Sequence, residues 1–134
     1  MGKHLLLDLK CFNRELMEDK KVITNILNNC VSKINMNKLI EPVVVDGAMH
    51  NKGLSAFVII ETSHISIHTF SDRNKVAFDL YSCKDYDENI ITEYLMTKFD
   101  KSEIINKIVI KRFDEWRRLR WQKLIQKNGT DNII

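Results

Sequence analysis

The residues best suited to chemistry lie in one eight-residue run, Ser63–Phe70, which reads SHISIHTF. Polar and apolar side chains alternate along it, a pattern that predicts a β-strand with two different faces. One face then carries the imidazoles and a hydroxyl, together with the closing aromatic: His64, Ser66, His68 and Phe70. Such groups can transfer protons or activate a nucleophile. The alternative is a solvent-facing strand whose polar residues have no catalytic role.

The three cysteines of the chain, Cys11, Cys30 and Cys83, are scattered without CxxC spacing. An odd, dispersed set argues against a disulfide framework and against a zinc site, so we predict no metal and a reducing, cytoplasmic environment. The longest apolar runs are too short to cross a bilayer, and we predict no membrane insertion.

The elements that must hold these residues can be predicted from hydrophobic periodicity. A short strand is expected at His4–Leu9, and Asn13 is a candidate cap for a helix over Arg14–Asn35. That helix carries an apolar stripe at spacings of three and four residues: Val22, Ile23, Ile26, Leu27, Cys30, Val31 and Ile34. Four strands are then expected in hairpin succession: Pro42–His50, Leu54–Glu61, Ser63–Phe70 and Lys75–Cys83.

A second helix is predicted over Asp87–Phe99, with Ile90, Ile91, Tyr94 and Leu95 on its apolar face, and a closing strand over Ile104–Ile110. This order of elements indicates an α+β fold, a two-layer sandwich in which an antiparallel sheet carries helices on one face. The length of 134 residues fits one hydrophobic core.

The net charge of +3 is concentrated near the C-terminus, where residues 111–127 hold seven basic side chains against two acidic ones. We therefore expect a basic helical tail over 113–134 that follows a domain over 1–112. Arginines and two tryptophans in that tail could bind phosphates. An amphipathic helix that packs its aromatics on its own domain or on a dimer mate is the stronger interpretation, and no nucleic acid is expected as a partner.

Several segments together resemble the prokaryotic S-adenosylmethionine decarboxylase proenzymes, from about Gly2 to Arg112. The matching segments are GKHLLLDL at the start, the turn Gly53-x-Ser55, the run ETSHISIHT and the segment DLYSC that ends at Cys83. The SHxSIHT run with a downstream cysteine is the most specific of these.

The resemblance implies a chain that cuts itself between Thr62 and Ser63 and converts Ser63 into a covalent pyruvoyl group, the cofactor that forms a Schiff base with the substrate. It also implies that His68 is the acid–base group of processing and that Ser55 assists there. Cys83 is implied as the proton donor in decarboxylation. A homodimer of cleaved protomers is implied as well, with residues of both subunits near each site.

The sequence departs from the family pattern at three positions. The family usually has Glu directly before the serine, where this chain has Thr62. Asp72 stands for a glutamate that binds the substrate ribose, and Met49 stands where many relatives have a phenylalanine that stacks on adenine. His64, beside the cleavage point, could affect processing or substrate binding.

Three functions follow as hypotheses. The first is decarboxylation of S-adenosylmethionine, which makes the aminopropyl donor for polyamine synthesis. Met49 and Asp72 favour a second, a pyruvoyl-dependent arginine or ornithine decarboxylase on the same scaffold. Thr62 supports a third, an uncut relative that acts as a binding partner.

Overall fold

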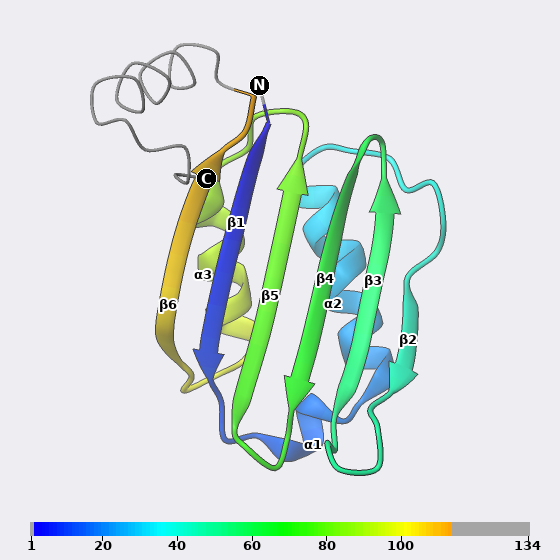
Figure 1. Ribbon diagram of the computed structural model, residues 1–134, viewed down its shortest axis with the longest axis vertical. Helices are drawn as coiled ribbons and strands as arrows, with labels where there is room; N and C mark the ends of the chain where they lie inside the picture. Colours follow the sequence, from blue (N-terminus) through cyan, green and yellow to red (C-terminus); the bar gives the residue numbers. More distant parts are fainter. Residues whose placement is uncertain (1, 114–134) are drawn as a thin grey trace, which may run out of the picture.

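The computed structural model of the chain describes residues 2–113 (Figure 1). The predicted basic tail therefore lies, apart from Phe113, outside the described residues. The elements follow in the order β1 (Lys3–Lys10), α1 (Arg14–Met17), α2 (Lys20–Lys33), β2 (Val43–Asp46), β3 (Leu54–Ile60), β4 (Ser63–Phe70), β5 (Lys75–Ser82), α3 (Glu88–Lys98) and β6 (Glu103–Lys111).

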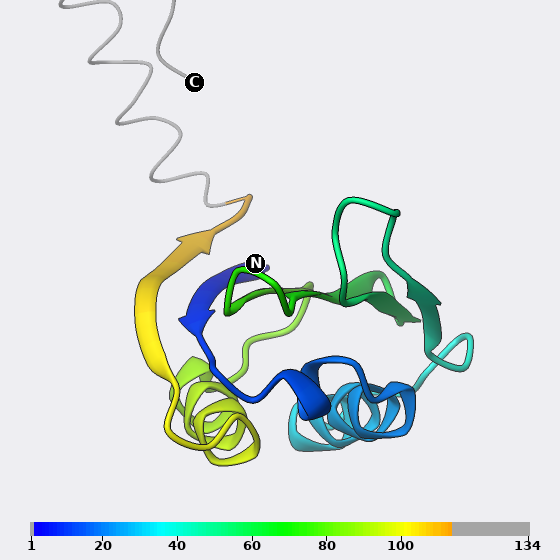
Figure 2. The ribbon, with the colours of Figure 1, turned by 90° about the horizontal axis from the view of Figure 1, so that it is seen from below.

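The strands form a single six-stranded sheet in the order β2-β3-β4-β5-β1-β6, and every neighbouring pair is antiparallel. The view from below shows that α1, α2 and α3, the helices of residues 2–113, all lie on the same side of the sheet (Figure 2). The predicted α+β two-layer sandwich is therefore confirmed. Its uncovered surface is called the open face below.

Burial alternates along the strands as the sequence pattern predicts. In β1 the leucines that face the helices, Leu5, Leu7 and Leu9, are fully buried, whereas the residues between them are only partly so. The stripe on α2 meets them with Ile23, Ile26, Leu27, Cys30 and Val31. Full burial of one such side chain contributes about 1.5–3 kcal/mol, so this interface fixes the positions of the strands.

The prediction of one long helix over Arg14–Asn35 is wrong, because the helix is interrupted at Glu18 and Asp19. Asp19 has an extended backbone, and its carboxylate accepts hydrogen bonds from the N–H groups of Lys21 and Val22, which makes it the N-cap of α2. Asn13 caps α1 in the same way, as predicted. The apolar stripe continues across the interruption, so hydrophobic periodicity alone does not reveal the break in the helix.

One further boundary and one helix face differ from the predictions. The strand expected over Pro42–His50 is limited to Val43–Asp46, because the chain leaves the sheet at Gly47, whose N–H binds the carbonyl of Gly53. The apolar face predicted for the second helix is correct at Ile91 and Leu95, which are buried, but Ile90 is exposed. No helix within residues 2–113 is long and apolar enough to cross a membrane.

Lys3 anchors the loop that follows β5 to the first residues of β1. Its buried ammonium donates to the carbonyl of Tyr86 and to Glu88 at 2.7 Å, and it lies 3.0 Å from Asp85. Burial opposes the charged form of Lys3, but the bonds to Glu88 and Asp85 outweigh it and raise the pKa of Lys3. The same bonds lower the pKa values of both carboxyl groups. The ion pairs therefore stabilise the fold only while Lys3 is protonated and the carboxylates are ionised.

We predict that Lys3→Met lowers the free energy of unfolding by about 1.5 kcal/mol at pH 7, because charge-assisted hydrogen bonds are lost while the alkyl stem stays. Since the carboxyl pKa values are lowered by folding, this difference should be complete above the ordinary carboxyl range and shrink as the pH falls below about 4. Urea unfolding at pH 7 and pH 3.5 measures it. Lys10→Met, at the exposed end of the same strand, is the control; an equal loss in both variants would contradict the prediction.

Candidate active site

Ser63 is the first residue of β4 and follows a two-residue turn, Glu61–Thr62, that joins it to β3. The pairing of Ile60 with Ser63 closes this turn. The side chain of Ser63 points to the helix side of the sheet and is nearly buried, and its hydroxyl oxygen accepts a hydrogen bond from the N–H of Cys83 at 2.9 Å. The candidate nucleophile is thus held next to the carbonyl group that precedes it.

Cys83 is placed beside Ser63 because it directly follows β5, the neighbour of β4 in the sheet. Its sulfur lies 2.8 Å from the hydroxyl oxygen of Thr62 and 3.6 Å from the carbonyl oxygen of Glu61. The hydrogen bonds from Thr62, first, and Ser63 lower the pKa of the Cys83 thiol. Two residues predicted from sequence, Ser63 and Cys83, therefore do meet.

Thr62 has a backbone φ of +48°, in the left-handed region. A β-branched side chain rarely occupies that region, and residues held there cost about 1–3 kcal/mol of strain. The turn imposes this geometry, because two residues must reverse the chain between paired positions 60 and 63. The strain lies at the residue whose carbonyl group would be attacked.

Ser55 and His68 form a second pair, on the open face. They are directly opposite each other in the β3–β4 ladder, and the Ser55 hydroxyl oxygen lies 2.8 Å from Nδ1 of His68. The turn before β3 fixes this register through Gly53, whose φ of +126° and close approach to the carbonyl of Thr69 leave no space for a Cβ. An imidazole that is hydrogen-bonded to a hydroxyl group can act as a general acid or a general base.

The two pairs lie at opposite ends of β4. Ser63 begins the strand and His68 is five residues further on, a separation of about 17 Å along an extended backbone. Figure 1 shows the β3–β4 turn at one end of the sheet and the β4–β5 turn at the other. His68 of the same chain therefore cannot contact Ser63, and the sequence run SHISIHT does not form a single local site.

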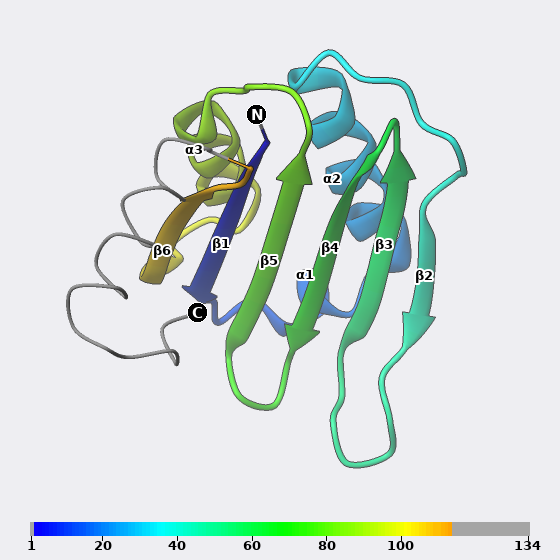
Figure 3. The same cartoon turned by 45° about the horizontal axis from the view of Figure 1, so that its top comes forward.

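Met49 and Asp72 lie at the same end as the Ser55–His68 pair, in the β2–β3 and β4–β5 connections (Figure 3). Met49 is almost fully exposed, at 98%. Asp72 is half exposed and lies 3.9 Å from Arg14. Neither residue contacts Ser63 or Cys83, so the structure leaves the predicted substrate-binding residues separate from the predicted cleavage point.

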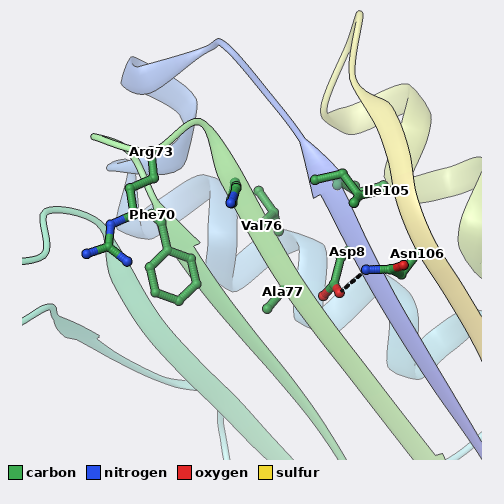
Figure 4. A pocket seen from close by; sticks show the side chains of 9 residues that line it. Asp8, Phe70, Arg73, Val76, Ala77, Ile105 and Asn106 are labelled. Atoms are coloured by element: carbon green, nitrogen blue, oxygen red, sulfur yellow. Dashed lines mark hydrogen bonds between the residues drawn. The ribbon is translucent and has the colours of Figure 1, made fainter.

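A hollow of about 280 Å³ opens on the sheet around Ala77, the residue of β5 that is paired with His68 (Figure 4). It exists because small Ala77 pairs with both His68 and Asp8, which leaves a gap between these larger side chains. Phe70 and Arg73 line one side, and Asp8 accepts a hydrogen bond from Asn106 on the other. The hollow offers an aromatic surface and charges of both signs next to the acid–base pair.

His64 lies on the open face near the Ser63 end of β4. Its ring centroid is 6.0 Å from that of Tyr81 and 6.3 Å from that of His4, which in turn lies 3.2 Å from Asp79. Burial, and secondly the proximity of His4, lower the pKa of His64. A neutral imidazole is therefore favoured one residue after the cleavage point. Within residues 2–113 no three His, Cys, Asp or Glu residues gather as metal ligands would.

Comparison with known proteins identifies the family. The family model for S-adenosylmethionine decarboxylase matches residues 3–112. The chain belongs to this family. Among its relatives, the S-adenosylmethionine decarboxylase proenzyme of Clostridium botulinum is 30% identical over 109 residues, which cover 77% of this chain and 89% of the relative. That of Thermodesulfovibrio yellowstonii is 29% identical over 104 residues, covering 75% and 73%.

A solved structure supports the same assignment. The crystal structure of the adenosylmethionine decarboxylase from Aquifex aeolicus superposes with a TM-score of 0.70 at 25% identity, covering 84% of this chain and 90% of that one. The resemblance inferred from the SHxSIHT run and Cys83 is thus confirmed at the level of family and fold.

The contact between the side chain of Thr62 and the sulfur of Cys83 is not predicted by the sequence motif. A signal for it was present, because a two-residue connection between well-defined strands requires an unusual backbone at one of its residues. His4, which shares the open face with His64, was likewise not among the predicted site residues.

Proposed function

We propose that this chain is a self-processing, pyruvoyl-dependent decarboxylase that acts on S-adenosylmethionine as part of a homodimer. The observation that carries the proposal is the division of its candidate residues into two half-sites. One contains Ser63, Thr62 and Cys83, and the other contains Ser55 and His68 with the hollow beside them. The family membership of residues 3–112 supplies the chemistry that these half-sites fit.

Processing begins at Ser63. Its hydroxyl oxygen attacks the carbonyl carbon of Thr62, the C–N bond breaks, and the hydroxyl proton passes to the nitrogen, which gives an ester. Loss of the Ser63 Cα proton then breaks the Cβ–Oγ bond and leaves a carboxylate on Thr62. Water replaces the remaining nitrogen as ammonia, and Ser63 becomes a ketone at a new N-terminus. The strained φ of Thr62 and the adjacent Cys83 N–H favour the first step.

A proton acceptor is needed for these steps, and His68 of the same chain is about 17 Å away along β4. A second copy packed on the open face in the opposite strand direction would bring its Ser55–His68 pair to the end of the sheet where Ser63 lies. The open face supports such packing, because six apolar side chains there are 38–51% exposed: Val43, Val45, Phe57, Ile59, Ile108 and Ile110. Covering them would gain free energy from the hydrophobic effect.

The residues around Ser63 fit the cofactor that would form from it. The position is nearly buried, which limits access of water, and Cys83 adjoins it. The ketone supplies an acceptor for the substrate amine and for the electrons released when carbon dioxide leaves. Cys83 then returns a proton to the substrate carbon. Met49 and Asp72 would contact the nucleoside from the second copy, together with the hollow beside His68.

Self-processing predicts two fragments, residues 1–62 and 63–134, in purified wild-type protein. Intact mass spectrometry should show them in place of the 15.8 kDa chain, and Ser63→Ala should remain one species. Ser66→Ala is the matched control, because Ser66 lies on the same strand but points to the open face. A wild-type chain that stays whole would leave the uncut binding partner as the better hypothesis.

The substrate is tested by release of carbon dioxide from carboxyl-labelled compounds. Cleaved protein should release it from S-adenosylmethionine with a kcat/KM at least about 100-fold above that for arginine or ornithine, because a nucleoside contributes several kcal/mol of binding. The reverse preference would establish the arginine or ornithine decarboxylase that the exposed Met49 and shortened Asp72 favour.

The two-subunit site predicts complementation between inactive variants. Ser63→Ala and His68→Ala should each remain uncut when expressed alone. When they are co-expressed, the His68→Ala chain should be cut in mixed dimers, up to about half of its molecules for random pairing. Fragment masses identify which chain was cut. Absence of cleavage in mixtures shown to contain heterodimers would refute a site shared between subunits.

A further inference from the structure

Three atoms from the cleavage turn and the loop after β5 form a compact hydrogen-bonding group. The hydroxyl oxygen of Thr62 lies 2.8 Å from both the sulfur of Cys83 and the carbonyl oxygen of Glu61, and the sulfur lies 3.6 Å from that carbonyl. The hydroxyl has a single proton to donate. When it points to the sulfur, it stabilises the thiolate form of Cys83.

This contact depends on the residue type at position 62 and on the backbone there. The left-handed φ of +48° directs the Thr62 side chain across the end of the sheet toward the loop after β5. Thr62 is also the residue whose peptide bond to Ser63 would be cut. Cleavage of that bond would therefore alter the residue that is hydrogen-bonded to the sulfur of Cys83.

The charged groups near the sulfur come from the same two segments. Glu61 lies in the turn and Lys84 follows Cys83, and their side chains are 3.7 Å apart. The charge of Lys84 also lowers the pKa of Cys83, but less than the hydroxyls of Thr62 and Ser63 do. His64, on the adjacent strand, points to the open face and belongs to the cluster of His4 and Tyr81. The two hydroxyls, that of Thr62 first, are thus the main groups that favour the thiolate.

We propose that Thr62 is a positioning residue that holds the Cys83 sulfur as a hydrogen-bond acceptor before cleavage, and that cleavage releases Cys83 to serve as a proton donor. The release depends on the proposed self-processing, whereas the contact itself belongs to the uncut chain. Thr62 would thereby couple maturation to the protonation state that decarboxylation needs.

Cleavage removes the hydroxyl of Ser63 and places a charge beside that of Thr62. The Ser63 hydroxyl oxygen departs as part of the new Thr62 carboxylate, so one of the hydroxyl groups that favour the thiolate is lost. The carboxylate places a negative charge on the residue next to the sulfur, and like charge disfavours a thiolate. The pKa of Cys83, lowered in the uncut chain by Thr62 and Ser63, should therefore rise on maturation.

Alkylation by iodoacetamide measures this, because the thiolate is the reactive form. Cys11 and Cys30 are fully buried, and burial raises the pKa of Cys30 to about 12, so the rate in folded protein reports on Cys83. Mass spectrometry of the alkylated peptide confirms the site.

The first comparison uses uncut protein with Ser63→Ala, with or without a second change at Thr62. Thr62→Val keeps the β-branch but removes the hydroxyl, whereas Thr62→Ser keeps the hydroxyl. At pH 7 the parent should react about 3–10-fold faster than Thr62→Val, with the midpoint of its pH–rate profile at lower pH, and Thr62→Ser should match the parent. Coincident profiles for the parent and Thr62→Val would overturn the proposal. Circular dichroism checks folding, and Thr62→Ala replaces the valine variant if that variant is unfolded.

The second comparison is between fully cleaved wild type and the uncut His68→Ala protein, which keeps the hydroxyls of both Thr62 and Ser63. Slower alkylation of the cleaved form at pH 7 is expected, and an equal or faster rate would also overturn the proposal. The first comparison needs neither cleavage nor decarboxylation. A wild-type chain that never cuts itself would therefore refute the proposed function separately from the Thr62 contact.

Discussion

The pairing of β4 with its two neighbours is the constraint on which the rest of the site depends. An extended strand has a fixed rise per residue, so the register that places Ser63 opposite Ile60 also places His68 opposite Ser55 at a set distance. The sheet is held rigid by the leucines of β1 and the apolar stripe of α2 beneath it. Ser63 and His68 therefore cannot approach each other within one chain without breaking the ladder, and the proposed mechanism needs His68 from a second chain.

This division explains what the sequence could and could not predict. The alternating pattern of SHISIHTF correctly placed His64, Ser66 and His68 on one face, because a period of two is a local property of the strand. The helix break at Asp19 was missed because the apolar stripe continues through it, and only the hydrogen bonds of the cap reveal it. The separation between Ser63 and the Ser55–His68 pair follows from strand length. Residues that are close together in the sequence motif therefore lie far apart along the extended strand.

The residues that depart from the family pattern differ in how much the scaffold constrains them. Met49 and Asp72 lie in exposed connections, where a changed side chain disturbs no packed neighbour, so substrate preference could change there without cost to the fold. Thr62 lies in a two-residue turn fixed at both ends by strand pairing, and its backbone must remain left-handed whichever residue occupies it. Substitution at this position therefore changes the strain and the contact with Cys83 but leaves the geometry of the turn.

The strain at Thr62 and the hydrogen bond to Cys83 act in opposite directions on the uncut chain. A β-branched residue in the left-handed region raises the free energy of the proenzyme, whereas the hydroxyl contact with the sulfur lowers it. In the proposed processing, cleavage would free the φ angle of Thr62 and remove the hydroxyl of Ser63 in the same event. Relief of the strain at the turn would then accompany formation of the ketone, while loss of the Ser63 hydroxyl near Cys83 would favour a protonated thiol. A single bond rearrangement would then both generate the electron acceptor and prepare the acid that completes the reaction.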